Sequence, residues 1–303
     1  MFRAKNLESL LHINNIYLKF EGNNPTGTHK DRISILHVNK ALKEGFNTIT
    51  VASCGNYGSS IAYFAHLNDL KAVIYLPREY QKSRIEEIVR KYQAKVVLVD
   101  GKYEDAVEIS KAHAKKYGWF DANPGSHPEL NKEGYEKIAF EVFEGLGTAP
   151  ATVSVPVGNG TTISGIYFGF EKLYNNGKIV KIPKMIAAST DGGNPIIECF
   201  KNNKKEIIDL LPAQIKETEI NEPLVTYHPY DGKAALKALR NSQGYAEYIT
   251  DSEMQHYSKV LKGAENIDVL PASTASLAAL VKILKKYDIT GNHVVILTGK
   301  NMD

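Results

Sequence analysis

The chain has 303 residues, of which 43% are hydrophobic and 23% are charged. This composition is ordinary for a globular protein, and the length suits two domains or one large α/β unit with a sizeable core. Its 37 basic and 34 acidic residues are interspersed and leave a formal net charge of +3. Because no basic block marks a nucleic-acid-binding tail, we expect no nucleic-acid partner.

The numbers and spacing of the cysteine, histidine and apolar residues exclude further classes of protein. The two cysteines, Cys54 and Cys199, are too few for a disulfide framework or a structural zinc site. The nine histidines lack the i, i+4 pairing of a metal-binding helix, so we expect no metal. No apolar run is long enough to cross a membrane, and the start of the chain does not resemble a signal peptide. These features predict a cytoplasmic protein without a membrane partner.

The apolar residues alternate along the chain between the period of a strand and the period of a helix. Strands are predicted at residues 15–21, 48–53, 72–76, 96–99, 151–157, 184–189 and 293–297. Helices are predicted at residues 30–45, 61–70, 83–92, 103–117, 131–146, 163–174, 195–200, 232–239, 252–261 and 273–287. This alternation predicts parallel βαβ units, whereas polar residues 203–230, with Pro212, Pro223 and Pro229, are predicted to be surface loops.

One lysine stands at the junction of the first predicted strand and helix. Residues 24–32 read N-P-T-G-T-H-K-D-R, a turn-forming Asn-Pro and a glycine that lead to Lys30. Ligands of open α/β sheets bind beyond the carboxyl ends of the strands. A lysine there can form a Schiff base with an aldehyde cofactor if desolvation keeps its amine partly unprotonated. Lys30 is therefore a candidate catalytic residue, although most lysines in such strings are solvated charges.

Four further polar turns follow strand ends, at residues 53–58, 158–162, 191–194 and 298–301. The turn at 158–162 reads G-N-G-T-T and opens a helix, so its amides and hydroxyls form a candidate receptor for a phosphate dianion. A tight strand-to-helix turn is the structural alternative. The turn lacks the third glycine of a dinucleotide fingerprint and the Gly-Lys-Ser/Thr of a P-loop, which makes a nucleotide-binding Rossmann protein the weaker hypothesis.

Two other turns carry candidate contacts for a small aromatic ligand. In S-C-G-N-Y-G, residues 53–58, amides and the Ser53 hydroxyl could hold a carboxylate, and the Asn56 amide could reach a ring hydroxyl. Thr298 offers a neutral hydroxyl to a ring nitrogen. The structural alternatives are a left-handed turn for Asn56 and a small buried filler for Cys54.

Together these motifs resemble the fold-type II pyridoxal-phosphate enzymes, the tryptophan synthase β-subunit superfamily, and within it the threonine synthases most closely. Residues 24–32 are similar to N-P-T-G-S-F-K-D-R, whose lysine carries the cofactor. Residues 53–58 resemble the family's asparagine loop, and residues 156–166 its phosphate cup. Other matches in family order are Glu133-Gly134, Ile138-Ala139-Phe140-Glu141, Asn194-Pro195-Ile196, residues 271–277 and Leu297-Thr298-Gly299.

The resemblance implies an α/β enzyme of two domains, with parallel or mixed sheets flanked by helices. Residues 1–40 and 135–303 would form a large cofactor-binding domain. Residues 41–134 would form a small mobile domain that carries the asparagine loop, and closure of the two domains would exclude water. The implied cofactor is pyridoxal 5'-phosphate, and the family usually forms homodimers.

The resemblance also implies a role for each motif. Lys30 would be the catalytic residue and would hold the cofactor, Asn56 would contact its ring hydroxyl and Thr298 its pyridine nitrogen. The cofactor phosphate would bind to Gly158, Asn159, Gly160, Thr161 and Thr162. The substrate carboxylate would lie among Ser53, Cys54, Gly55 and Tyr57.

The implied reaction is elimination or replacement on an amino-acid substrate, most closely the conversion of O-phosphohomoserine to threonine. A serine/threonine dehydratase and a cysteine-synthase-like β-replacement on O-activated serine are alternatives. A non-catalytic ligand-binding relative is a remote one, because such a protein would be expected to lose Lys30 or the phosphate cup.

The chain departs from the threonine synthase pattern at His29, Cys54 and Leu270. Residues 123–127 lack an arginine that often follows Asn-Pro in threonine synthases and helps to hold the substrate's phosphate. His127 and Lys132 are the basic residues that could replace it. The extra N-terminal region of many threonine synthases, with its Thr-Pro-Leu entry, is also expected to be absent.

Overall fold

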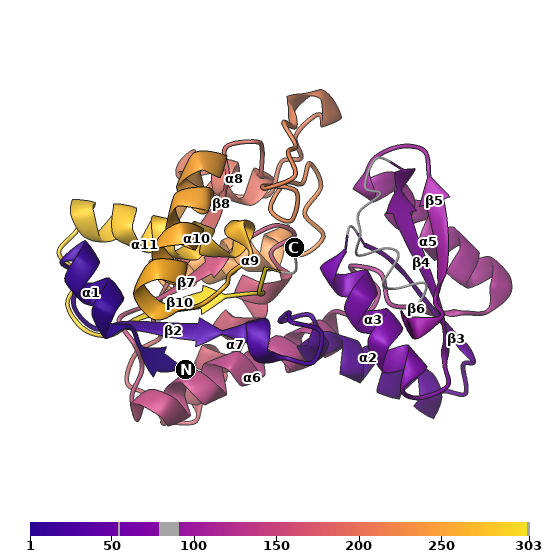
Figure 1. Cartoon of the computed structure of the whole chain (residues 1–303), viewed down its shortest axis with the longest axis horizontal. Helices are drawn as coiled ribbons and strands as arrows, with labels where there is room; N and C mark the ends of the chain where they lie inside the picture. Colours follow the sequence, from indigo (N-terminus) through magenta and orange to yellow (C-terminus); the bar gives the residue numbers. More distant parts are fainter. Residues whose placement is uncertain (54, 79–90, 302–303) are drawn as a thin grey trace. The chain divides into compact units, whose positions relative to one another are not determined.

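The computed structural model describes residues 1–53, 55–78 and 91–301. It contains two compact units (Figure 1). The larger unit comprises Met1–Asn23 and Tyr135–Asp303, and the smaller unit comprises Asn24–Gly134. Cys54 and most of the helix predicted at residues 83–92 lie outside the described residues.

The larger unit is built on a six-stranded sheet of order β1-β2-β10-β7-β8-β9 (Figure 1). β1 pairs antiparallel with β2, and every other pair is parallel. The strands are β1 (Phe2–Arg3), β2 (Ile16–Phe20), β7 (Thr152–Pro156), β8 (Lys184–Thr190), β9 (Tyr245–Ile249) and β10 (His293–Leu297). The carboxyl ends of β2, β10, β7 and β8 therefore share one edge of the sheet, where the predicted turns begin.

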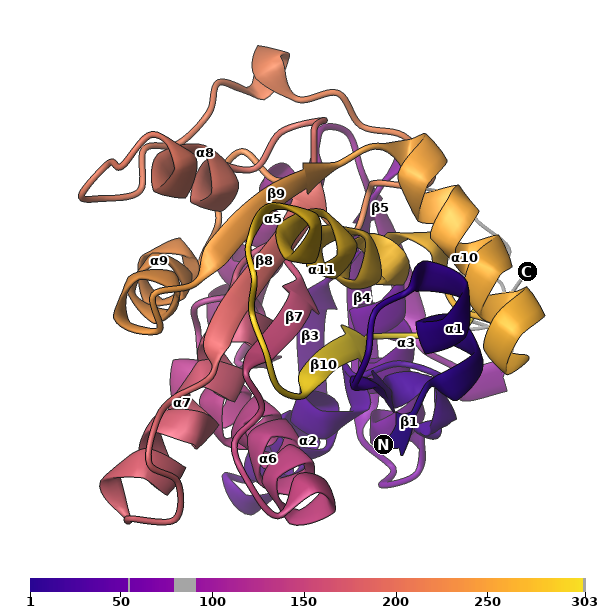
Figure 2. The same ribbon diagram turned by 90° about the vertical axis from the view of Figure 1, so that its left-hand side faces the viewer.

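Helices cover both faces of this sheet (Figure 2). One face packs against α1 (Lys5–Leu11) and α11 (Ala275–Lys286), and α10 (Asp251–Glu265) packs on these two helices. The other face carries α7 (Thr161–Asn175), α8 (Pro195–Lys201) and α9 (Gly232–Asn241), and α6 (Pro128–Leu146) packs on α7. The core between α11 and the sheet contains fully buried aliphatic side chains such as Leu18, Val295 and Leu280.

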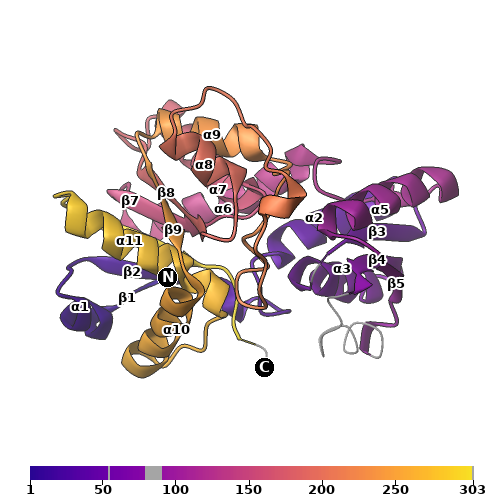
Figure 3. The ribbon, with the colours of Figure 1, turned by 90° about the horizontal axis from the view of Figure 1, so that it is seen from above.

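The smaller unit has a parallel four-stranded sheet of order β5-β4-β3-β6, of which β3, β4 and β5 are labelled in Figure 3. Its strands are β3 (Thr48–Ala52), β4 (Lys71–Pro77), β5 (Lys95–Val99) and β6 (Phe120–Asp121). Helices α2 (Asp31–Lys43) and α3 (Asn56–His66) pack on one face, and α5 (Tyr103–Tyr117) packs on the other. The period-two alternation of β3 explains this, since Ile49 and Val51 enter the α2–α3 core while the hydroxyl of Thr50 meets Ser110 of α5 at 3.0 Å.

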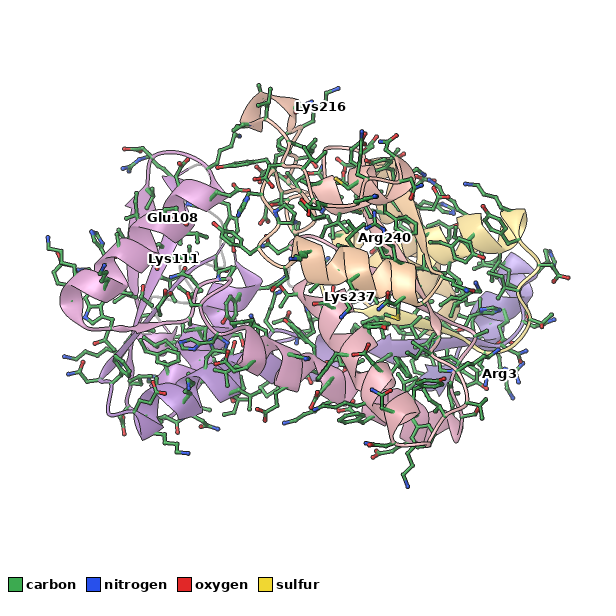
Figure 4. All side chains as sticks on the ribbon, turned by 180° about the vertical axis from the view of Figure 1, so that it is seen from behind. Arg3, Glu108, Lys111, Lys216, Lys237 and Arg240 are labelled. Carbon is green, nitrogen blue, oxygen red and sulfur yellow. The ribbon has the colours of Figure 1, made fainter. Side chains whose placement is uncertain are left out.

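Outward-facing charges complete the amphipathic pattern of the surface helices (Figure 4). Lys237 of α9 is exposed while its neighbours Leu236 and Leu239 are buried. On α5, Glu108 and Lys111 are one turn apart, with 3.6 Å between their charged atoms. Within the described ranges, none of the helices is long and apolar enough to cross a bilayer.

The two units differ from the sequence-based division at one boundary. The sequence placed residues 1–40 with the larger domain, whereas residues 24–40 belong to the smaller unit. The reason is that α2 packs against α3, and Val38 contributes to the smaller unit's core together with Ile61. Lys30 is therefore a residue of the smaller unit. The functional roles assigned to the two domains stay predictions.

Candidate active site

The glycine turn after β7 is a close-packed backbone loop that leads into α7. Gly160 has φ of 86°, a left-handed conformation that favours glycine. A Cβ atom there would lie 2.8 Å from the Cβ of Ala235, and one at Gly158 would lie 2.6 Å from the carbonyl oxygen of Pro223. Both positions thus require glycine for close approach of the chain. Since the first amides of the 15-residue helix α7 have no partner within the helix, this turn fits the phosphate of the expected cofactor.

An anionic side chain lies beside this turn. The hydroxyl of Thr161 donates to the carboxylate of Asp231, and the backbone N–H of Asp231 donates to the carbonyl oxygen of Asn159 at 3.0 Å. The side-chain oxygen of Asn159 also accepts from the N–H of Tyr230 at 3.4 Å. In this structure the Thr161 hydroxyl is therefore committed to Asp231, and the helix-start amides are the donors suited to a phosphate. Sequence reasoning missed Asp231 because 69 intervening residues separate it from Thr161 and no local pattern marks it.

Asn194 holds the glycine turn from the neighbouring strand end. Its buried side-chain N–H₂ lies within hydrogen-bond distance of the carbonyl oxygens of Val157, Gly158 and Leu224, at 3.2, 3.0 and 3.0 Å. Its side-chain oxygen accepts from the N–H of Ile196 at 3.0 Å and caps α8. The Asn-Pro-Ile motif thus supports the turn from behind.

We expect Asn194→Ala to lower the free energy of unfolding by about 2–3 kcal/mol, because it removes a helix cap and leaves buried carbonyl oxygens without a donor. Urea unfolding followed by circular dichroism measures the change. Asn202→Ala is the matched control, since Asn202 is exposed and its side chain donates to Glu198 one turn earlier; its effect should stay within about 0.5 kcal/mol. Equal effects of the two substitutions would contradict the anchoring role.

Thr298 follows the last strand and is fixed by the motif of residues 271–277. Its backbone N–H donates to the hydroxyl oxygen of Ser273, and its own hydroxyl lies 3.1 Å from the same atom. Ser276 in turn donates to the carbonyl oxygen of Ile296 at 2.8 Å. Thr298 is therefore a neutral hydroxyl held in place at the same sheet edge as the glycine turn.

In the smaller unit, Lys30 immediately precedes α2 at the end of a closed loop. The N–H of Gly27 donates to the carbonyl oxygen of Asn24 at 2.8 Å, and the Asn24 side chain donates to the carbonyl oxygen of Thr28 at 3.2 Å. Lys30 is partly buried, and its Nζ lies 5.9 Å from the centre of the Tyr57 ring. The structure thus brings the predicted lysine close to one residue of the asparagine loop.

The asparagine loop is shaped by Ser53. Its hydroxyl oxygen accepts from the N–H groups of Gly55 and Gly58 at 3.1 and 2.8 Å, which closes the turn at the start of α3. Gly58 has no room for a side chain, because a Cβ there would lie 2.8 Å from Ile74. Ser53 is buried and serves the loop itself, so Asn56, Tyr57 and the first amides of α3 are better placed than the Ser53 hydroxyl to face a ligand.

Tyr57 is anchored by groups that sequence reasoning missed. Its hydroxyl donates to the carbonyl oxygen of Ala122 at 3.0 Å and lies 3.4 Å from Nδ1 of His37. Nε2 of His37 lies 3.1 Å from the side-chain oxygen of Asn131. Burial lowers the pKa of His37 to about 4, so the ring is neutral at pH 7. The sequence signal that could have identified His37 as buried was its helical spacing, since His37 lies on the apolar face of α2 with Ile33 and Ala41.

The buried His37 predicts a pH dependence of stability. Its folded pKa of about 4 lies below the ordinary value of 6.5, so the unfolded chain binds a proton there that the folded chain does not. The stability contributed by neutral His37 is complete above pH 6.5 and is lost as the pH falls towards 4, by up to about 3 kcal/mol. The lowered pKa of buried His293 acts in the same direction.

Urea unfolding of the wild type and of His37→Gln between pH 7 and pH 4.5 measures this dependence. We expect the variant to lose less stability on acidification than the wild type. His256→Gln, at an exposed position, should keep the wild-type slope. A His37→Gln profile parallel to that of the wild type would show that His37 does not titrate as described.

The segment that lacks the arginine, residues 123–127, is held by hydrogen bonds and ring stacking within the smaller unit. The Asn123 side chain accepts from the N–H of Ala52 at 2.7 Å and donates to Asp121 at 2.6 Å. His127 stacks on Phe120 with 4.6 Å between ring centres, and its Nδ1 lies 3.3 Å from a carboxylate oxygen of Glu129. His127 thus packs against an aromatic ring and an acid. Over the described part of the chain, no group of three or more His, Cys, Asp or Glu side chains could hold a metal ion.

Comparison with known proteins gives a consistent result. The sequence profile of the pyridoxal-phosphate dependent enzymes matches residues 1–299. The chain is 36% identical to a threonine synthase of Methanocaldococcus jannaschii over 100% of this chain and 74% of that protein. It is 32% identical to a threonine synthase of Methanosarcina acetivorans over 94% of this chain and 69% of that protein.

Solved structures confirm the fold. Threonine deaminase isoform 2 of Solanum lycopersicum superposes with a TM-score of 0.83 at 19% identity, covering 100% of this chain and 84% of that one. Maize serine racemase superposes with a TM-score of 0.82 at 18% identity, covering 100% and 88%. The predicted α/β fold of type II, with parallel and mixed sheets flanked by helices, is therefore confirmed.

The family match and the local chemistry agree on the cofactor. The glycine turn suits a phosphate, and a partly buried lysine precedes α2 as the motif requires. The chain therefore belongs to the family of pyridoxal-phosphate-dependent enzymes, and it is a fold-type II lyase, similar to threonine synthases, whose cofactor is pyridoxal 5'-phosphate.

Proposed function

We propose that this enzyme converts O-phosphohomoserine to threonine, with one water consumed and one phosphate released. The observation that carries the proposal is the match over the whole chain to a protein named threonine synthase at 36% identity. The chain also keeps the lysine, the asparagine loop, the glycine turn and the threonine after the last strand, in the family's order.

Each candidate residue has a chemical role in this proposal. Lys30 would hold the cofactor through its aldehyde carbon, and its amine would move the proton at the substrate's Cα. Asn56 contacts the ring hydroxyl. The amides of Gly158, Asn159, Gly160, Thr161 and Thr162 bind the phosphate, supported by the hydroxyl of Thr162. When bound, the cofactor supplies an electron sink for the bonds at Cα.

Two further contacts set the character of the reaction. Thr298 would offer a neutral hydroxyl instead of a carboxylate to the ring nitrogen. Such a partner would leave that nitrogen largely unprotonated, which would favour reactions in which the electrons leave promptly with a departing group. The loop of Ser53, Cys54, Gly55 and Tyr57 binds the substrate's carboxylate, chiefly through the N–H groups at the start of α3.

Product analysis with three substrates tests the proposal. The holoenzyme should release phosphate and threonine from O-phosphohomoserine, and should convert threonine and O-phosphoserine more slowly. Formation of 2-oxobutanoate from threonine as the dominant reaction would assign a dehydratase instead. Replacement of the phosphate of O-phosphoserine by sulfide would assign a cysteine-synthase-like enzyme. Binding of the cofactor without turnover of any of the three would favour the non-catalytic alternative.

We infer further that the enzyme acts in the cytoplasm as a homodimer, and that the smaller unit moves to close the site during turnover. The inference of a dimer is supported by the homodimeric state that is usual in the family. Light scattering of the purified protein measures the oligomer directly, and a mass equal to one 33.6 kDa chain would contradict it.

A further inference from the structure

The residue after the predicted catalytic lysine is a buried carboxylate. Asp31 occupies the first position of α2 and is only 4% exposed. Its oxygens accept from the backbone N–H of Thr26 at 2.7 Å, from the Thr26 hydroxyl and from the hydroxyl of Ser60 at 2.6 Å. Each of these donors is neutral, and among the described residues no cation forms an ion pair with Asp31.

A buried carboxylate without a cation needs compensation, because its removal from water is unfavourable. Three hydrogen bonds to the charged acceptor supply part of this compensation. The positive end of the 13-residue helix α2 supplies a further part. Starting a helix does not require burial, because an exposed Ser or Asp at a helix start does the same. Helix capping therefore does not account for the burial of Asp31, whereas its hydrogen bonds to Thr26 and Ser60 do.

Asp31 connects the two loops that carry the candidate site residues of the smaller unit. Thr26 belongs to the loop that ends at Lys30, and that loop is closed by its own hydrogen bonds. Ser60 lies one turn into α3, which begins with Asn56 and Tyr57, and is itself fully buried. The Asp31 carboxylate is thus hydrogen-bonded at once to the loop that ends at Lys30 and to the first turns of α3, the helix that begins with Asn56 and Tyr57.

We propose that Asp31 is a positioning residue that fixes Lys30 relative to the turn of Asn56 and Tyr57, so that the lysine amine meets the cofactor's aldehyde in one orientation. This inference rests on the proposed role of Lys30. Asp31 touches neither cofactor nor substrate in the proposal and acts through the loop of Thr26 and through α3. A misplacement of about 1 Å is enough to slow such a bond-forming encounter by about 10²-fold.

Two ligands distinguish a misplaced Lys30 from a general loss of cofactor binding. Pyridoxal 5'-phosphate requires both the phosphate turn and a correctly placed Lys30. Pyridoxine 5'-phosphate has no aldehyde, so its affinity reports the phosphate and ring contacts alone. The fraction of Lys30 linked to the cofactor is measured by borohydride reduction followed by peptide mass spectrometry, a readout that needs no turnover.

Asp31→Asn and Ser60→Ala are the two test variants. Asp31→Asn preserves size but removes the charge, and Ser60→Ala removes only the connection to α3. We expect both to lower the rate of borohydride-trappable linkage at Lys30 by about 10-fold or more, with pyridoxine 5'-phosphate affinity changed less than 2-fold. Ser59→Ala is the matched control, because this neighbouring buried serine has no hydrogen bond to Asp31 in the described structure and should behave as wild type. Ser60→Thr keeps the hydroxyl donor and should therefore retain the wild-type rate of cofactor linkage at Lys30.

The outcomes are distinguishable. Wild-type linkage in both test variants would overturn the positioning role, as would equal losses of affinity for the two ligands. If Asp31→Asn does not fold, Ser60→Ala decides by itself. If the wild-type protein gives no reduced cofactor on Lys30, the proposed function of Lys30 fails, and this failure is separate from that of Asp31.

Discussion

Lys30→Ala is expected to remove the visible absorbance of lysine-linked cofactor and to lower turnover by about 10³-fold or more. Alanine can neither hold the aldehyde nor move a proton at Cα. Absorbance spectra of the reconstituted variant, together with threonine formation from O-phosphohomoserine, measure both effects. The glycine turn belongs to a different part of the chain, so pyridoxine 5'-phosphate should bind to the variant as it does to wild type.

Lys40→Ala provides the control for this substitution. Lys40 lies in α2, the helix that Lys30 precedes, and forms an i, i+4 ion pair with Glu44 at 2.9 Å. Its loss should leave the absorbance band and the turnover unchanged and alter stability by less than about 0.5 kcal/mol. An absorbance band that survives in Lys30→Ala but shifts in another lysine variant would reassign the cofactor-linked residue.

Gly160→Ala is expected to weaken cofactor binding by about 10²-fold. Alanine at φ of 86° carries a backbone cost of about 1–2 kcal/mol, and its Cβ would meet the Cβ of Ala235 at 2.8 Å, which adds about 1–3 kcal/mol of overpacking. Relief of this strain displaces the amides of the turn from the phosphate. Titration of the cofactor-free protein with pyridoxal 5'-phosphate, followed by absorbance, measures the affinity.

Gly177→Ala is the control that introduces backbone strain without steric overlap of the new Cβ atom. Gly177 follows α7 and has φ of 65°, but no atom lies within 4 Å of the position of its Cβ. Its replacement should cost about 1 kcal/mol of stability and leave cofactor affinity unchanged. If Gly160→Ala binds the cofactor as tightly as Gly177→Ala does, the glycine turn is not the phosphate site.

The local pattern of the sequence determined most of the helices and strands. The helix at residues 103–117 was predicted with the bounds it has, because Gly118 adopts a left-handed C-cap with φ of 65° that a sequence reader can anticipate. The strands preceding the glycine turn and Thr298 were visible as apolar runs between turn residues. Among the α-helices and strands of the described residues, sequence reasoning missed β1, α1, β6 and β9, of which β1 and β6 have only two residues each.

The family resemblance was also available from the sequence, because the lysine motif, the asparagine loop and the glycine turn are short contiguous strings. A contiguous string fixes the local backbone through its glycines and caps, so it is legible without any distant contact. The family, the cofactor and the fold class were therefore within reach of the sequence, and the comparisons confirm them.

Only the tertiary structure determined how these strings are supported. Asp231 lies against Thr161 from 70 positions further along the chain, and Asn194 supports Gly158 from 36 positions away. In the sequence, His37 and Asp31 are not distinguishable from ordinary residues of a surface helix. In the structure both are buried, and α2 packs on α3. The physical reason is that a hydrogen bond between distant segments depends on where the whole chain places both partners, which periodicity and turn propensity do not encode.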